Sequence, residues 1–192
     1  REALVAIAAL FVVTRGALVL VALYLESSIP LAYHGPSFAT APLLTSFTGS
    51  DSVYLLGIAT EGYHAEPVHQ AFRDWAFFPL YPMLMRALAW PFGGSDRALW
   101  IAGIALSYTC LFLGLAVLHR LTARTFGGDR ETARRTLLYV AVFPFAYFFT
   151  QVYTESLFLL TSVSAVAAAV ASRWGWAGLS GALAALTRTN GI

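Results

Sequence analysis

Long apolar runs separated by short polar connections dominate the chain. A helix needs roughly 20 mainly apolar residues to cross a bilayer, and two runs reach that length while three others approach it. The runs are 3–25, 98–118, 136–154, 156–172 and 174–192. The pattern predicts an all-α, polytopic helical membrane protein whose residues 1–192 form a single transmembrane domain with five spans.

The two ends of this pattern carry further information. The first run is too long for the apolar core of a signal peptide, so we expect it to be retained as a span. Arg15 lies near its middle, where a lone charge is costly, and is expected to find a partner inside the bundle. The last run reaches Ile192 without a polar flank, which predicts that the chain is the N-terminal part of a longer protein.

Basic and acidic residues are unequally distributed between the connections. The connection 119–135 holds five Arg against two acids, whereas the long segment 26–97 holds six acids against three Arg. The positive-inside rule therefore places 119–135 in the cytoplasm and 26–97 outside. With alternating spans, Asp51, Glu155 and Arg188 come from three separate stretches of the chain to one membrane face.

The long outer segment contains prolines and glycines at positions typical of loops and short helices. Prolines at 30, 36 and 42 predict a loop or broken helix over 29–45. Asp51 to Gly62 is expected to form a short helix that Gly62 stops. Pro79–Trp90 is too short to span, so we expect it to lie along the interface or dip into it.

Composition narrows the class of protein. The 192 residues are 58% hydrophobic and 11% charged, with mean hydropathy +0.68, which excludes an ordinary soluble domain. All twelve basic residues are Arg, which favours a GC-rich bacterial source. A net charge of +2 gives no reason to expect nucleic acid. Cys110 is the only cysteine, so an intrachain disulfide is excluded and a packing role is expected.

Three ionisable residues at the predicted outer face are candidates for chemistry. Asp51, flanked by small residues, is placed to accept a proton from an attacking hydroxyl, or alternatively to cap a helix. Glu155 is expected either to orient a substrate hydroxyl or to face water at the interface. Arg188 either holds an anion such as a phosphate or snorkels to the surface.

Other polar residues of the outer segment give weaker signals. Glu61 and Glu66 are expected to be solvated loop acids. His64 and His69 flank Glu66, but this loop spacing is poor support for a metal site, and no metal is predicted. The prolines of the run 77–82, Phe-Phe-Pro-Leu-Tyr-Pro, are expected to fix the entry to the following helix.

Several short blocks, taken in order, resemble the PIG-V family of mannosyltransferases. The blocks are Asp51-Ser52-Val53-Tyr54, Ile58-Ala59 with Gly62-Tyr63, Phe77-Phe78-Pro79-Leu80-Tyr81-Pro82, Tyr153-Thr154-Glu155-Ser156-Leu157-Phe158 and Thr187-Arg188-Thr189-Asn190-Gly191. Together they extend over most of the chain. One position departs from the family pattern, because Ser50 stands before Asp51 where Trp is usual. The chain is also about half the usual length of the family.

The resemblance implies a fold and an activity. Such proteins are similar to GT-C glycosyltransferases, which move a sugar, typically mannose, from a polyprenyl (dolichyl) phosphate to an acceptor hydroxyl with inversion, at the extracytoplasmic face. Eukaryotic members add the second mannose of the GPI anchor. In a bacterium a lipid-linked or cell-envelope glycan is the expected acceptor. Membrane lipid is the remaining partner, and no cofactor is expected.

The resemblance also assigns roles to residues. The acidic residue of the family's first outer loop maps onto Asp51, the expected catalytic base. The residues expected to contact substrates are Tyr54, Tyr63, Phe78, Tyr81, Tyr153, Glu155, Arg188 and Asn190. A transporter or flippase for lipid-linked sugars is the alternative, but the chain shows no internal repeat of the kind typical of transporters. A purely structural membrane subunit is a third interpretation.

Overall fold

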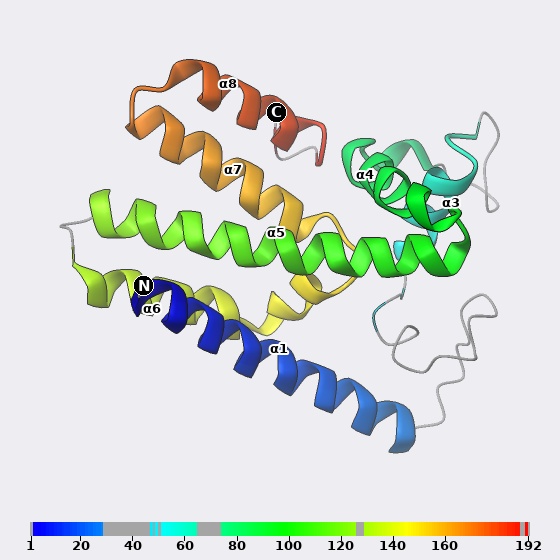
Figure 1. The fold of residues 1–192 in the computed structure, drawn as a ribbon, viewed down its shortest axis with the longest axis horizontal. Helices are drawn as coiled ribbons and strands as arrows, with labels where there is room; N and C mark the ends of the chain where they lie inside the picture. Colours follow the sequence, from blue (N-terminus) through cyan, green and yellow to red (C-terminus); the bar gives the residue numbers. More distant parts are fainter. Residues whose placement is uncertain are drawn as a thin grey trace.

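The computed structural model describes residues 2–28, 47, 49, 51–64, 74–125, 129–188 and 191. The described residues form helices and connecting turns and include no β-strand, which confirms the all-α prediction (Figure 1). The helices are α1 Glu2–Ser28, α3 Ser52–Thr60, η1 Asp74–Ala76, α4 Leu80–Ala89, η2 Trp90–Phe92, α5 Asp96–Thr125, α6 Arg130–Val142, η3 Pro144–Thr150, α7 Glu155–Val170 and α8 Trp174–Ala185.

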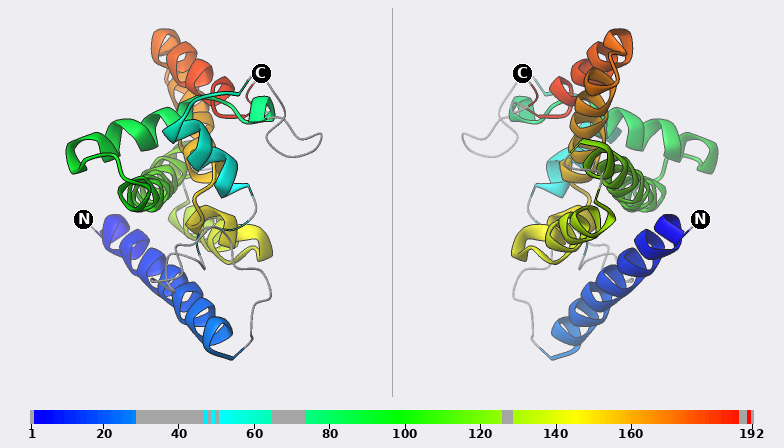
Figure 2. Two further views of the ribbon diagram at one scale, coloured as in Figure 1. Left: turned by 90° about the vertical axis from the view of Figure 1, so that its right-hand side faces the viewer. Right: turned by 90° about the vertical axis from the view of Figure 1, so that its left-hand side faces the viewer.

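Helix α5 is the central element of the molecule. Figure 1 shows α7 and α8 layered on one side of it, α6 and α1 on the other, and α3 and α4 beside its N-terminal half. Figure 2 shows α1 crossing this layer at an angle. The packing of α5 on α7 is close, because a Cβ added at Gly114 would lie 3.4 Å from the Leu160 backbone.

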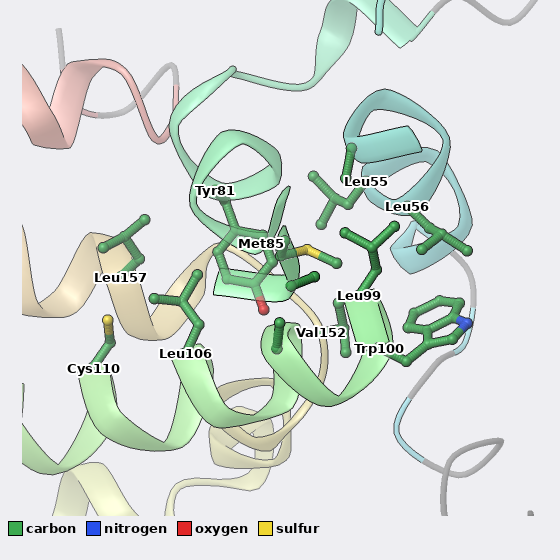
Figure 3. Close-up of a cluster of buried hydrophobic side chains, with 13 residues drawn as sticks. Leu55, Leu56, Tyr81, Met85, Leu99, Trp100, Leu106, Cys110, Val152 and Leu157 are labelled. Atoms are coloured by element: carbon green, nitrogen blue, oxygen red, sulfur yellow. The ribbon is translucent and has the colours of Figure 1, made fainter. Parts of the chain in front are cut away.

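A buried cluster joins α3, α4, the first half of α5 and the segment before α7 (Figure 3). Its largest buried side chains include Tyr81, Met85, Leu99, Trp100 and Val152. Cys110 lies in the same cluster, as expected for a packing residue. Close packing of these buried side chains gives many van der Waals contacts, which hold the short helices onto the long one.

Two described helices are long and apolar enough to cross a membrane, Ala3–Leu25 within α1 and Asp96–Thr125. A third candidate arises if η3 and α7, which meet at an angle of 98°, form one bent span. The helical membrane fold is confirmed, and the count of five spans stays a prediction.

The helix expected over 136–154 is not continuous. Helix α6 ends at Val142, Phe143 has an extended ψ of 139°, and Pro144 begins the 3-10 helix η3. A proline has no backbone N–H and disfavours helical geometry in the residue before it, so the break follows from Pro144.

Arg15 fills the gap that this break creates. Its guanidinium donates to the Ala141 carbonyl at 2.6 Å and to the Ala146 carbonyl at 2.7 Å, and the residue is only 3% exposed. The partner predicted inside the bundle is therefore backbone, at a place where the carbonyl groups of a regular helix would already be paired.

The molecule has two distinct ends. The C-terminal end of α5, the start of α6 and the α7–α8 turn lie at one end, and α3, α4 and the C-terminal end of α8 lie at the other (Figure 1). The Leu80 N–H donates to the Leu186 carbonyl at 3.1 Å, which ties α4 to the end of α8. The arginine-rich connection and the residues predicted to carry chemistry are thus at opposite ends.

Short helices form in the segment 26–97 close to the predicted bounds. Helix α3 begins after Asp51, and Gly62 follows it with φ of +88°, a conformation that favours glycine. Helix α4 and η2 together replace the single helix expected over 79–90, and a left-handed Gly93 ends them. The predicted loop at 29–45 lies outside the described residues.

Candidate active site

A cavity of about 120 Å³ opens at the end of the bundle that carries α3 and α4. Four stretches of chain line it: the start of α3, the residues after η1, the start of α7 and the residues after α8. The lining residues are Asp51, Leu55, Ala76, Phe77, Phe78, Tyr153, Thr154, Glu155, Thr187 and Arg188. Asp51, Glu155 and Arg188, which the topology predicted to share one face, share this cavity.

Asp51 occupies the N-cap position of α3 but does not act as a cap through its side chain. Its backbone is helical, with φ −68° and ψ −18°, and its side chain makes no capping hydrogen bond. Its carbonyl accepts from Tyr54 and Leu55, which starts the helix. The backbone therefore fixes Asp51 at the helix end, and its side chain lines the cavity.

Tyr153 connects the start of α3 to the segment before α7. Its hydroxyl accepts from the Asp51 N–H and donates to the Gly49 carbonyl, both at 3.3 Å. The ring packs edge-on against Phe148, with centroids 5.5 Å apart. Because the ring is held at both ends, Tyr153 sets the distance between Asp51 and α7.

Glu155 and Arg188 form an ion pair across the cavity lining, through Glu155 Oε1 and Arg188 Nη1. Arg188 is about one-third exposed, at 36%, and Glu155 is partly buried. The second carboxylate oxygen, Glu155 Oε2, is buried and has no hydrogen-bond partner within the described part of the chain. Buried polar atoms are almost always satisfied, so this oxygen marks a position for a ligand group or water.

Aromatic side chains form one wall of the cavity. Phe77 and Phe78 line it, and the Tyr54 ring stacks on Phe77 with centroids 5.4 Å apart. The Tyr63 hydroxyl donates to the Phe77 carbonyl at 2.7 Å. Tyr54 and Tyr63, both predicted to contact substrate, are not part of the cavity lining; they support a residue that is.

Tyr81 lies away from the cavity. It is fully buried at 0% exposure, its hydroxyl donates to the Gly103 carbonyl at 2.9 Å, and it lies 2.7 Å from Ser107 Oγ (Figure 3). Ser107 in turn donates to the Gln151 carbonyl at 2.8 Å. The placement points to a structural role, because this network fixes the segment that carries Tyr153.

Some sequence predictions lie outside the described residues. They are Asn190, Ser50, Glu66 and His69. His64 is described, and it contacts Glu61 and Asp74 rather than forming a metal set. Among the described residues, no group of three His, Cys, Asp or Glu is placed to hold a metal ion.

Thr187 and Asp74 are polar residues of this region that were not among the predicted site residues. Thr187 lines the cavity beside Arg188, and its hydroxyl donates to the carbonyl of Leu183 in α8 at 2.7 Å. Asp74 is buried and contacts His64, ten residues earlier. The burial of Asp74 beside His64 depends on a contact between residues ten positions apart, which no local sequence pattern indicates.

The arrangement combines one carboxylate, one carboxylate–guanidinium pair and an aromatic wall. A carboxylate accepts protons from hydroxyl groups, and a guanidinium binds phosphate through directed N–H groups. Aromatic faces are common in pockets that bind organic ligands. The cavity therefore suits a substrate that carries hydroxyl groups and an anion together.

A comparison with models of protein families identifies the family of this chain. The family model described as Mannosyltransferase (PIG-V) matches residues 6–192, nearly the whole chain. No curated protein and no solved structure matches, so the assignment rests on this family model and on the residue blocks described above. The chain belongs to the PIG-V mannosyltransferase family and is a helical membrane glycosyltransferase.

Proposed function

We propose that this protein moves mannose from a polyprenyl (dolichyl) phosphate to a hydroxyl of a lipid-linked or cell-envelope glycan, with inversion. Mannosyl transfer follows from the family. The observation that carries the finer proposal is the cavity shared by Asp51 and the Glu155–Arg188 pair. This combination supplies a base for an acceptor and a cation for a phosphate.

Asp51 acts as the general base in this proposal. The acceptor oxygen attacks C1 of the mannose, and its proton passes to the Asp51 carboxylate. The bond from C1 to the phosphate oxygen breaks, and its electron pair leaves with the polyprenyl phosphate. Attack opposite the leaving group inverts C1. A phosphate departs as an anion, so the reaction does not need the raised-pKa acid that glycosidases use.

Arg188 and Glu155 divide the remaining tasks. A guanidinium has five N–H donors, so its bond to Glu155 leaves others to bind the donor phosphate. Glu155 Oε2 accepts a hydrogen bond from a hydroxyl of the sugar or acceptor, which gives this buried oxygen a partner. Tyr153 and Phe78 shape the cavity, Tyr54 and Tyr63 support the aromatic wall, and Asn190 is retained as a predicted contact.

The polyprenyl tail and the membrane orientation complete the proposal. An apolar groove of about 490 Å³ lies between η2, the end of α4 and the start of α5, lined by residues that include Leu88, Phe92 and Ile101. This groove is our candidate for part of the tail. The positive-inside rule and the arginine-rich 119–135 connection support an outward-facing cavity, in a bacterial cell membrane.

Transfer from radiolabelled polyprenyl-phosphate-mannose tests the proposal directly. The full-length protein in membranes is compared with Asp51→Asn and with Asp96→Asn, a matched change at an exposed acid of α5. We expect label to reach an acceptor with wild type and Asp96→Asn only. Equal turnover in Asp51→Asn rejects the base assignment, and no transfer by any folded protein rejects the donor.

Two further measurements separate the finer points. The anomeric configuration of the product, read from its NMR coupling constants, tests inversion. Insensitivity to collapse of proton and sodium gradients separates an enzyme from a coupled transporter, which would stall. Retained configuration or dependence on a gradient contradicts the proposal.

A further inference from the structure

The imidazole of His64 lies between two carboxylates. Its Nδ1 is 3.0 Å from Asp74 Oδ2, and its Nε2 is 3.0 Å from Glu61 Oε2. Asp74 is buried, with a side chain only 3% exposed, whereas Glu61 is solvent-exposed. Asp74 Oδ1 is also buried and has no hydrogen-bond partner among the described residues. His64 is thus the described side chain that faces this buried carboxylate.

The geometry calls for a protonated ring. A neutral imidazole has one N–H donor, and both ring nitrogens here lie at hydrogen-bond distance from a carboxylate oxygen. The hydrogen bond to Asp74, followed by the one to Glu61, raises the pKa of His64 above its ordinary value of 6.5. Burial raises the pKa of Asp74, but its hydrogen bonds and charge interaction with His64 outweigh that effect and lower it overall.

The same residues tie the end of α3 to η1 by backbone contacts. The His64 N–H donates to Asp74 Oδ2 at 2.9 Å, and the Trp75 indole N–H donates to the His64 carbonyl at 2.8 Å. The Tyr63 hydroxyl donates to the Phe77 carbonyl. Because η1 ends at Ala76 and leads directly into Phe77 and Phe78, these contacts hold the aromatic wall of the cavity.

Few other titratable groups face this cluster in the described part of the chain. Glu61 faces the ring from the end of α3, and Asp74 faces it from η1. The phenol of Tyr63 is the next group; burial raises its pKa, and the charge of Asp74 raises it further. The imidazole is therefore the group whose charge changes near neutral pH.

We propose that protonated His64 is a positioning residue for mannosyl transfer: between Asp74 and Glu61 it holds η1 against α3 and so fixes the Phe77–Phe78 wall. The predicted effect on mannosyl transfer rests on the proposed function, whereas the protonation state of the ring does not depend on the donor. When the ring loses its proton, one hydrogen bond to a carboxylate is lost and the wall loosens. Transfer then falls as the pH rises through the pKa of His64.

A direct measurement of the ring tests this without any substrate. The full-length protein in nanodiscs, carrying isotope-labelled histidine, is titrated by NMR, and the His64 signal is assigned by its loss in His64→Gln. We expect the midpoint to lie above 6.5, and to fall in Glu61→Gln, a change at an exposed acid. Trp75 fluorescence is expected to change with the same midpoint. A His64 midpoint at or below 6.5 overturns the proposal.

The pH profile of transfer tests the positioning role. Loss of a hydrogen bond between charged groups predicts that the rate of transfer in His64→Gln at low pH is about tenfold below that of the wild type. The rate in this variant should not decline further as the pH rises through the wild-type midpoint. In Glu61→Gln the alkaline decline and the NMR midpoint should shift together to lower pH. His119→Gln, a matched change on α5 at the other end of the bundle, should keep the wild-type profile.

The NMR titration and the transfer assay together distinguish a failure of the proposed role of His64 from a failure of the proposed function. If the wild type does not use polyprenyl-phosphate-mannose, the donor is rejected, and the ring titration with Trp75 still decides the state of His64. If transfer occurs but His64→Gln keeps the wild-type alkaline decline, His64 does not position the wall.

Discussion

Arg15 and Arg188 are two arginines in apolar surroundings with different environments. Arg15 is 3% exposed, and its described hydrogen bonds go to Thr14 and to two backbone carbonyls at the α6–η3 break. Arg188 is about one-third exposed, pairs with the carboxylate of Glu155 and lines a cavity. The first has no access to a substrate, whereas the second has donors beside an open volume.

This difference shows that the role of a charged residue in a membrane protein depends on the groups with which it interacts. A guanidinium whose described bonds stabilise a broken helix compensates a defect of the backbone. A guanidinium paired with a partly unsatisfied carboxylate is part of a polar site that a ligand completes. The sequence singled out Arg15 as a costly charge in the middle of an apolar run, and Arg188 as a cation at the predicted outer face that either holds an anion or snorkels.

Removing the Arg188 side chain should have the largest effect, on activity. In Arg188→Gln we expect transfer to fall by about 100- to 1,000-fold, because a preorganised donor to the departing phosphate is lost. Some stability should also be lost, because the partly buried Glu155 is left without its cation. The measurement is transfer per folded molecule, with Arg173→Gln at the opposite end of α8 as the matched control. Full activity in Arg188→Gln would remove this residue from the site.

Removing the Arg15 side chain should affect stability instead. In Arg15→Met the Ala141 and Ala146 carbonyls lose their donor in a buried place, at a cost of about 3 kcal/mol. Thermal unfolding in nanodiscs measures this loss, against Arg134→Met on the exposed face of α6. Activity per folded molecule should stay near wild type. A variant as stable as wild type but inactive would reverse the comparison between the two arginines.

Gly103→Ala tests the connection between the core and the cavity. An added Cβ would lie 2.7 Å from Val152 Cγ1 and 3.1 Å from Met85 Cε, so the buried segment before Tyr153 must shift. We expect a loss of about 1–3 kcal/mol in stability, with reduced transfer. Gly178→Ala on α8 is the control, because a Cβ there meets nothing within 4 Å. An unchanged melting temperature would show that Val152 moves freely.

The smallest expected effect is the dependence of stability on pH. The raised pKa of His64 gives stability that is present below its unfolded value and lost as the pH rises through the folded value. The lowered pKa of Asp74 gives stability that is lost only as the pH falls through its folded value. Melting temperature should therefore decline as the pH rises above 6.5 and through the raised pKa of His64, and less in His64→Gln. Parallel curves for both proteins would contradict this.

The sequence predicted those parts of the molecule that depend on local pattern and topology. Gly62 and Pro79 marked the limits of short helices, and alternation of spans brought Asp51, Glu155 and Arg188 to one end. Contacts made by backbone groups were not predictable, and so the partners of Arg15 were missing. The break at Pro144 was readable from the chain, but the apolar run on both sides favoured a continuous helix.

Tyrosine side chains show the remaining limit of sequence interpretation. The family-like blocks contain four tyrosines with the same side chain: Tyr54, Tyr63, Tyr81 and Tyr153. A phenol binds a substrate or braces a neighbour with the same two groups, a ring and a hydroxyl. Which use applies depends on distances of a few ångströms, as Tyr81 beside Ser107 and Tyr153 beside Asp51 illustrate.

The pairing of Glu155 with Arg188 has a consequence for biosynthesis. Glu155 and Arg188 lie on either side of the α7–α8 hairpin, so neither charge is paired until both helices have been inserted side by side. An unpaired ionised group is costly inside a membrane. Correct insertion of the hairpin therefore neutralises both charges, and a hairpin inserted in the wrong way leaves both of them unpaired in the membrane.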